Sequence, residues 1–110
     1  MRTAGAGSVT VVPEPYRFSS PLWEYDGPAA WFFVSLPADI ADEIAQRSEG
    51  RTNGFGSVRV EVQVGGTRWS TSLFPDKRRR TYVLPVKRSV REAETLTDGQ
   101  DVDVVLALAC

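Results

Sequence analysis

The fold is decided by residues 58–74, VRVEVQVGGTRWSTSLF, in which a strand, a tight turn and a second strand follow one another. Over residues 58–64, valines alternate with polar or charged residues, so one face of this strand is apolar and the other faces water. Gly65-Gly66 is a common β-hairpin connection. The chain is then predicted to return antiparallel from Thr67 to Phe74, and Pro75-Asp76 is predicted to end that strand.

The N-terminal side of this hairpin is predicted to supply two further strands and the principal helix. Strand-forming residues from Tyr16 to Tyr25 lead to a turn at Asp26-Gly27-Pro28. The nearly continuous apolar run from Trp31 to Val34 is typical of a short buried strand. An amphipathic helix of about three turns is predicted to begin with Pro37 as its first helical residue, and Gly50 suits a left-handed stop after it.

The C-terminal side is predicted to add two more strands. Residues from Thr81 to Leu84 form a short strand that Pro85 limits. A turn or so of helix is predicted between Arg88 and Glu94. A turn at Asp98-Gly99 then leads into the last strand, in which alternate residues from Val102 to Leu108 are apolar.

These elements predict a mainly β protein with about six strands and one principal helix, without the βαβ rhythm of a parallel sheet. Connections of hairpin length favour antiparallel pairing, and a chain of 110 residues must wrap its sheet to bury both ends. We therefore expect a closed or nearly closed six-stranded barrel. Residues 1–15, rich in Gly and Pro, are predicted to be a flexible tail, and residues 16–110 a single domain.

The sequence lacks the residues that most common catalytic and metal-binding sites need. Histidine is absent and the single cysteine is Cys110, which removes the usual general base, the usual metal ligands and any disulfide framework. Asp101 and Asp103 are predicted to lie on a solvated strand face, and the hydroxyls of residues 70–72 have no base to activate them. The glycines of Gly54-Phe55-Gly56 precede a strand, which excludes a dinucleotide fingerprint. We expect no cofactor and no metal site, and leave enzyme activity open.

Three tryptophans suggest a ligand site. Trp23, Trp31 and Trp69 all fall on or beside predicted strands. They are predicted either to fill the core or to line an aromatic pocket at the mouth of the barrel. We include Trp31, Trp69 and the neighbouring Arg68 among the candidate binding residues.

Basic residues are concentrated in one segment. Residues 77–91 contain seven basic residues and no acidic one, which leaves a charge of −8 on the rest of a chain whose net charge is −1. The seven are Lys77, Arg78, Arg79, Arg80, Lys87, Arg88 and Arg91. The first four fall at a predicted turn between strands, where their side chains would be exposed. They are interpreted either as a solvated loop or as a surface for phosphate or carboxylate groups.

The chain resembles the domain of unknown function 1905 family at three signatures. They are WFFVSLP at residues 31–37, GGTRWSTSLFP at 65–75 and YVLPVKRSVR at 82–91, followed by the Gly99 turn and a Val-rich last strand. The resemblance spans about residues 16–109. It implies a closed six-stranded Greek-key barrel with a helix after the second strand, and it implies no chemistry.

Two loops depart from the pattern of that family. Lys77 to Arg80 stand where the family tends to have a glycine-rich turn, and Gly99-Gln100 stands where it tends to have Gly-Asp. The resemblance therefore does not extend to a function carried by these loops.

Three functions follow as expectations. The first is a non-enzymatic module that binds a small ligand or a protein partner at the barrel mouth or its loops. The second is binding of a nucleic acid or another polyanion through residues 77–91. The third is a small-molecule enzyme without histidine, built on Arg68, Tyr82 and Asp101. No apolar run reaches the roughly 20 residues of a membrane span, so we expect a cytoplasmic protein without a membrane partner.

Overall fold

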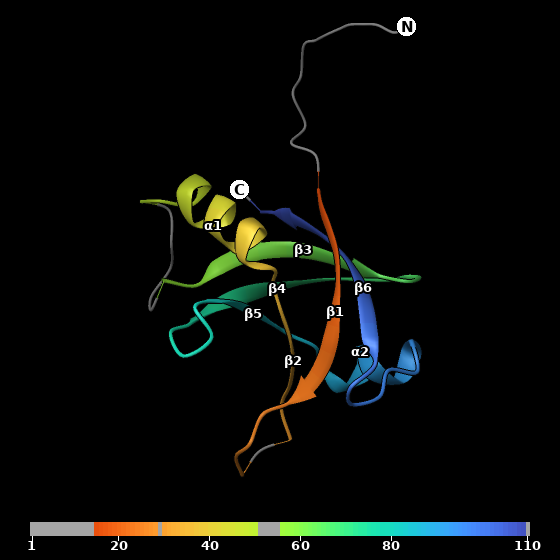
Figure 1. Ribbon diagram of the computed structural model, residues 1–110. Helices are drawn as coiled ribbons and strands as arrows, with labels where there is room; N and C mark the ends of the chain where they lie inside the picture. Colours follow the sequence, from red (N-terminus) through yellow and green to blue (C-terminus); the bar gives the residue numbers. More distant parts are fainter. Residues whose placement is uncertain (1–14, 29, 51–55, 110) are drawn as a thin grey trace, which may run out of the picture.

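In the computed structural model, which describes residues 15–28, 30–50 and 56–109, six antiparallel strands close into a barrel (Figure 1). The strands are β1 (Tyr16–Glu24), β2 (Phe32–Ser35), β3 (Val58–Val64), β4 (Thr67–Asp76), β5 (Thr81–Pro85) and β6 (Asp101–Leu108). Two helices accompany them, α1 (Ala38–Arg47) and α2 (Arg88–Ala93). The predicted six-stranded antiparallel barrel is confirmed, and it is closed.

The order of strands around the barrel is β1-β2-β5-β4-β3-β6. Strands β3, β4 and β5 are consecutive neighbours, whereas α1 lies in the crossing from β2 to β3 and α2 in the crossing from β5 to β6. Each crossing places a strand beside the far end of a three-strand meander, which is the Greek-key arrangement. Figure 1 shows the two helices near opposite ends of the barrel.

The hairpin of β3 and β4 forms as its sequence predicts. Val58, Val60, Val62 and Val64 are all buried, and Val62 lies opposite the buried Trp69. Gly65 in the connecting turn has a φ of +58°, a left-handed conformation that glycine adopts without strain. This face of the hairpin forms much of the core, together with apolar residues of β1, β5 and β6.

The prediction that Pro75-Asp76 ends the returning strand was wrong. β4 continues to Asp76, and Pro75 lies in register with Tyr82 of β5. The last pair between β4 and β3 is Leu73 with Val58, so beyond it β4 pairs with β5 alone in the described residues. Proline is tolerated in a strand where one edge needs no amide hydrogen, and Pro75 occupies such a position.

The principal helix begins one residue later than predicted. Pro37 is the residue before the first turn, with extended backbone angles of φ −59° and ψ 148°. Ala41 and Ile44 are the buried residues of α1. Arg47 in its last turn donates a hydrogen bond to the Tyr16 hydroxyl, 2.7 Å away, and this contact ties α1 to β1. The short helix predicted near Arg88 is present as α2.

The apolar run around β2 is less buried than its composition predicts. Val34 is completely buried, but Trp31 is 53% exposed and Phe33 is partly exposed. Side chains alternate between the two faces of a strand, so only every second residue of β2 reaches the core. The remaining rings lie on the outer surface of the barrel.

Residues 1–14 of the predicted tail (residues 1–15), Gly54 and Phe55 before β3, and Cys110 lie outside the described residues. Within the described part of the chain, neither helix is long and apolar enough to cross a membrane.

Candidate functional site

A pocket of about 460 Å³ lies between β4 and the segment that leaves β5 and enters α2. β4 pairs with β5 only from Phe74 to Asp76, and nearer its start, at Trp69 and Thr71, it pairs with β3. After Pro85 the chain turns into α2 instead of continuing along β4. The separation of these segments leaves the pocket, whose volume is in the range of small-molecule sites.

Four aromatic side chains line this pocket beside α2: Trp31, Phe32, Trp69 and Phe74. Trp69 is only 8% exposed and packs in the core, so it is a rigid wall of the pocket. Trp31 and Phe74 are 53% and 42% exposed, which leaves their rings open to a ligand. Phe32 is partly buried and packs against the core.

Three basic side chains also line the pocket: Lys87, Arg88 and Arg91. The guanidinium of Arg91 lies 4.1 Å from the centroid of the Phe32 ring, and its Nε donates a hydrogen bond to the Val86 carbonyl, 3.2 Å away. These two contacts fix its orientation, and its other N–H groups have no partner among the described residues. Arg88 forms an exposed ion pair with Glu92 at 2.9 Å.

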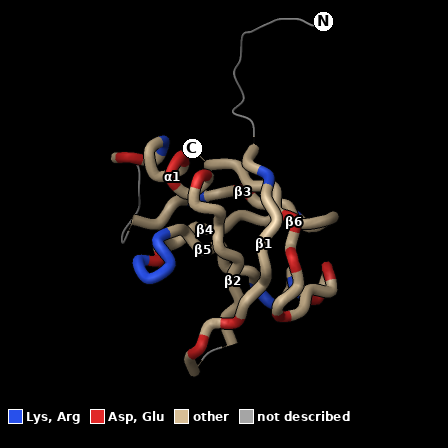
Figure 2. Tube along the Cα trace, in the orientation of Figure 1, with Lys and Arg blue, Asp and Glu red and all other residues tan. Residues whose placement is uncertain are grey.

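The basic turn, Lys77 to Arg80, lies elsewhere. Strand β5 and Val86 separate it from Lys87, a distance of roughly 23 Å along an extended chain. Figure 2 shows the two groups of basic residues as separate blue segments. All four side chains of the basic turn are exposed. The seven basic residues of segment 77–91 therefore form two groups instead of one patch.

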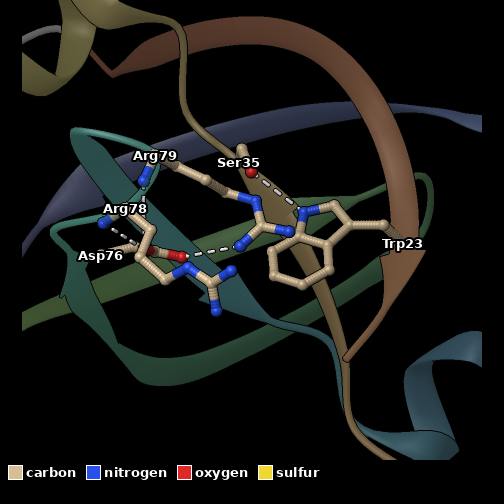
Figure 3. Close-up of polar contacts among 5 residues, drawn as sticks. All are labelled: Trp23, Ser35, Asp76, Arg78 and Arg79. Carbon is tan, nitrogen blue, oxygen red and sulfur yellow. Dashed lines mark hydrogen bonds and ion pairs between the residues drawn. The ribbon is translucent and has the colours of Figure 1, made fainter. Parts of the chain in front are cut away.

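Arg79 is the anchored member of the basic turn (Figure 3). Its guanidinium lies 3.8 Å from the centroid of the Trp23 ring and donates to the Asp76 carboxylate at 3.0 Å. The backbone N–H groups of Arg78 and Arg79 donate to the same carboxylate at 3.0 and 3.2 Å. The Trp23 indole donates to the Ser35 hydroxyl, 2.9 Å away. These contacts hold the turn against the barrel.

These contacts shift the pKa of the Asp76 carboxylate. Partial burial acts to raise the pKa of Asp76, but the hydrogen bonds from the backbone and guanidinium of Arg79 and from the backbone of Arg78 overcome this effect. The pKa of Asp76 is therefore lowered below its ordinary value. The charged carboxylate is part of the turn at neutral pH.

The other members of the basic turn are less constrained. The side chains of Lys77, Arg78 and Arg80 have no ion pair within the described parts of the chain. Lys77 and Arg80 line a smaller hollow of about 230 Å³ against α1. Arg80 has a φ of +57°, which is unfavourable for a residue with a side chain.

Several candidate residues lie away from the pocket beside α2. Arg68 is exposed and lines a different hollow of about 310 Å³ with residues of β3 and β6, because it points to the opposite face from Trp69. Asp101 and Asp103 are exposed on β6. No group of three or more potential metal-ligating His, Cys, Asp or Glu residues occurs among the residues that the structure describes.

Rings continue from the pocket over the outer surface of the barrel. Trp31 stacks on Phe33 with centroids 6.1 Å apart and planes at 14°, and Phe33 contacts Trp23 at 5.2 Å. We call Trp31, Phe33 and Trp23 the aromatic row. Tyr25, 51% exposed, packs edge-on against Phe33 at 6.3 Å. The aromatic row joins the pocket at Trp31 to the basic turn at Arg79.

Sequence reasoning singled out Trp31, Trp69, Lys87, Arg88 and Arg91, and the structure brings these five together. It missed the aromatic partners Phe32, Phe33, Phe74 and Tyr25. A signal for one of them was present, because alternation from the inward-facing Trp69 places Phe74 on the outer face.

The family comparison agrees with the fold. The family model described as Domain of unknown function (DUF1905) matches residues 18–106, from the third residue of β1 well into β6. No curated protein matches the chain. Because the match covers most of the barrel, the chain belongs to the family of this domain of unknown function, DUF1905.

Proposed function

We propose that this domain is a binding module that holds a small planar anion in the pocket beside α2. The observation that carries the proposal is the convergence of four aromatic and three basic side chains around one pocket of about 460 Å³. These residues come from β2 and the residue before it, from β4, and from α2 and the residue before it, which are far apart in the sequence.

The two kinds of side chain favour a ligand with two parts. The open rings of Trp31 and Phe74, with Trp69 behind them, suit a flat apolar body. Arg91 and Lys87 suit a carboxylate, sulfonate or phosphate, and Arg91 is already oriented by Phe32 and Val86. An arginine that is oriented before binding loses less conformational entropy when the ligand arrives.

The shape of the pocket favours a small ligand over a protein partner. Its wall includes the nearly buried Trp69, and its rim carries the charged side chains of Lys87 and Arg88. A flat protein surface would contact the rim and leave that wall uncovered.

Calorimetric titration with a matched pair of compounds tests the proposal. 1-Naphthyl phosphate should bind, and uncharged 1-naphthol should bind at least about tenfold more weakly, because it cannot pair with Arg91. Arg91→Gln should weaken naphthyl phosphate binding by about tenfold or more.

Arg17→Gln is the control, since Arg17 is exposed on β1 and paired in register with Val105, outside the pocket. It should bind the phosphate like the unmodified protein. Equal affinity for both compounds, or unchanged binding by Arg91→Gln, would overturn the proposal.

A further inference from the structure

We infer that the natural ligand is a single-stranded nucleic acid, with one base in the pocket beside α2 and the strand running along the aromatic row to the basic turn. This inference rests on the proposed function of the pocket and extends it to a longer surface. It joins the two groups of basic residues, which the fold separates, through one ligand.

The aromatic row supplies a continuous path between the two ends. Trp31 belongs to both the pocket and the row. From Trp31 the contacts pass through Phe33 to Trp23, and Arg79 covers the Trp23 ring at the far end. Proteins that bind single strands without sequence preference combine such rings, on which bases stack, with a track of basic groups for the phosphates.

The exposed apolar surface has the composition that base stacking requires. Tyr25, Trp31 and Phe74 are the large apolar side chains with high exposure among the described residues, and each of them is aromatic. An aliphatic patch would suit a protein partner equally well, but flat rings also match the faces of nucleobases. A duplex keeps its base faces stacked inside, so a single strand fits these rings better.

Positive charge at the basic turn and at the pocket, the two ends of the aromatic row, favours a polyanion over a second copy of this chain. Lys77, Arg78 and Arg80 at one end have no ion pair among the described residues, and Lys87 and Arg91 flank the pocket at the other. The basic turn and Lys87 are roughly 23 Å apart along the extended chain of β5 and Val86, a separation that a strand of a few nucleotides spans.

Acidic residues limit the path of the strand. Glu24 and Asp26 are exposed where β1 connects to β2, and Figure 2 shows red acidic segments along this connection. A phosphate chain would avoid this side and cross toward β5. Asp26→Asn should therefore strengthen binding of a strand by about two- to threefold, because it removes a repulsive charge.

The deciding experiment compares ligand length. Thymidine monophosphate should bind the pocket weakly, and oligothymidylates of two to eight nucleotides should bind with affinity that rises until the strand reaches the basic turn, then levels off. Calorimetry measures the mononucleotide, and fluorescence anisotropy of labelled strands measures the rest. With about three phosphates contacted, raising salt from about 50 to 200 mM should weaken the longer strands by roughly 20-fold.

The double variant Lys77→Glu/Arg80→Glu separates the inference from the proposed function. It should abolish the gain with length and leave mononucleotide binding unchanged, which also shows that the variant folds. The matched control is Arg17→Glu/Arg59→Glu, which makes the same charge change at exposed residues of β1 and β3. It should keep the gain with length.

Different failures point to different errors. Mononucleotide binding without any gain with length would overturn the nucleic-acid inference and leave the pocket as a small-anion site. Failure of both thymidine monophosphate and 1-naphthyl phosphate to bind would overturn the proposed function as well. Tighter binding of duplex than of single strands would contradict the inference. So would a protein dimer that Trp31→Ala dissociates, because a second copy would then cover the row.

Discussion

The two groups of basic residues in segment 77–91 differ in what holds them. In the basic turn, Arg79 is held between the Asp76 carboxylate and the Trp23 ring, so this arginine is part of the fold. At the start of α2, Arg91 is oriented on Phe32 but keeps N–H groups that the described protein does not use. The comparison teaches that a run of like charges in a sequence can contain both structural and ligand-binding residues, and that the difference lies in their partners.

The largest expected effect comes from removing the ring under Arg79. Trp23→Ala removes the contacts with Arg79 and Phe33 and the hydrogen bond to Ser35, and should lower the free energy of unfolding by about 2–3 kcal/mol. Trp31→Ala, at a half-exposed ring, should cost less than about 1 kcal/mol. Urea denaturation of both variants measures this difference. Equal losses would mean that the basic turn is no better anchored than the pocket.

A smaller effect on the free energy of unfolding is expected from a change at the Asp76 carboxylate. Asp76→Asn keeps an oxygen for the backbone N–H groups of Arg78 and Arg79 but loses the charge, and should lower the free energy of unfolding by about 1–2 kcal/mol at pH 7.

The pH dependence of that difference follows from the lowered pKa of Asp76. Since the folded-state pKa lies below that of the unfolded chain, about 3.9, the charged carboxylate stabilises the fold above that pH. This contribution is lost as the pH falls through the folded-state pKa. The difference in the free energy of unfolding between the unmodified protein and Asp76→Asn should therefore be constant from pH 7 to about 5. It should disappear in more acidic solution. A gap that stays constant to pH 2 would show that the charge does not stabilise the turn.

The smallest effect is expected at the rim of the pocket. The ion pair of Arg88 and Glu92 is highly exposed, so Glu92→Gln should change the free energy of unfolding by less than about 0.5 kcal/mol. It should, however, strengthen binding of 1-naphthyl phosphate by about two- to threefold, because it removes the carboxylate paired with a basic residue of the pocket. Thermal unfolding and calorimetry test the two parts, and weaker binding would contradict the proposed anion site.

The fold was more predictable than the site for a physical reason. Alternation over Val58 to Val64 and the Gly65-Gly66 turn are local signals, and local signals define a hairpin. The end of β4 was missed because the tolerance of Pro75 depends on which neighbour β4 has at that point, and that neighbour is set by the whole barrel. Pairing across the barrel also decides which side chains meet.

The candidate site also depends on pairing across the barrel, which local sequence signals do not reveal. Trp69 and Arg91 were recognisable as candidates from residue type, but their meeting depends on the departure of β5 from β4. Phe32 was not predicted because it lies in an apolar run that suits a core strand, and its contact with Arg91 joins residues far apart in the chain. Residue types thus predicted five of the seven aromatic and basic residues of the pocket, and the strand order decided that they meet.

The uneven pairing of the barrel gives it a weak seam. β5 is joined to β4 by three registered pairs and to β2 by three, whereas β3 and β4 share seven and β1 and β6 share six. Strands with few backbone hydrogen bonds open at lower free energy than the rest of a fold. The proposed ligand would lie along this seam, from Arg91 to the basic turn. Binding would then suppress local opening of β5, and the protein would become more rigid at one of its two most weakly paired strands, the other being β2.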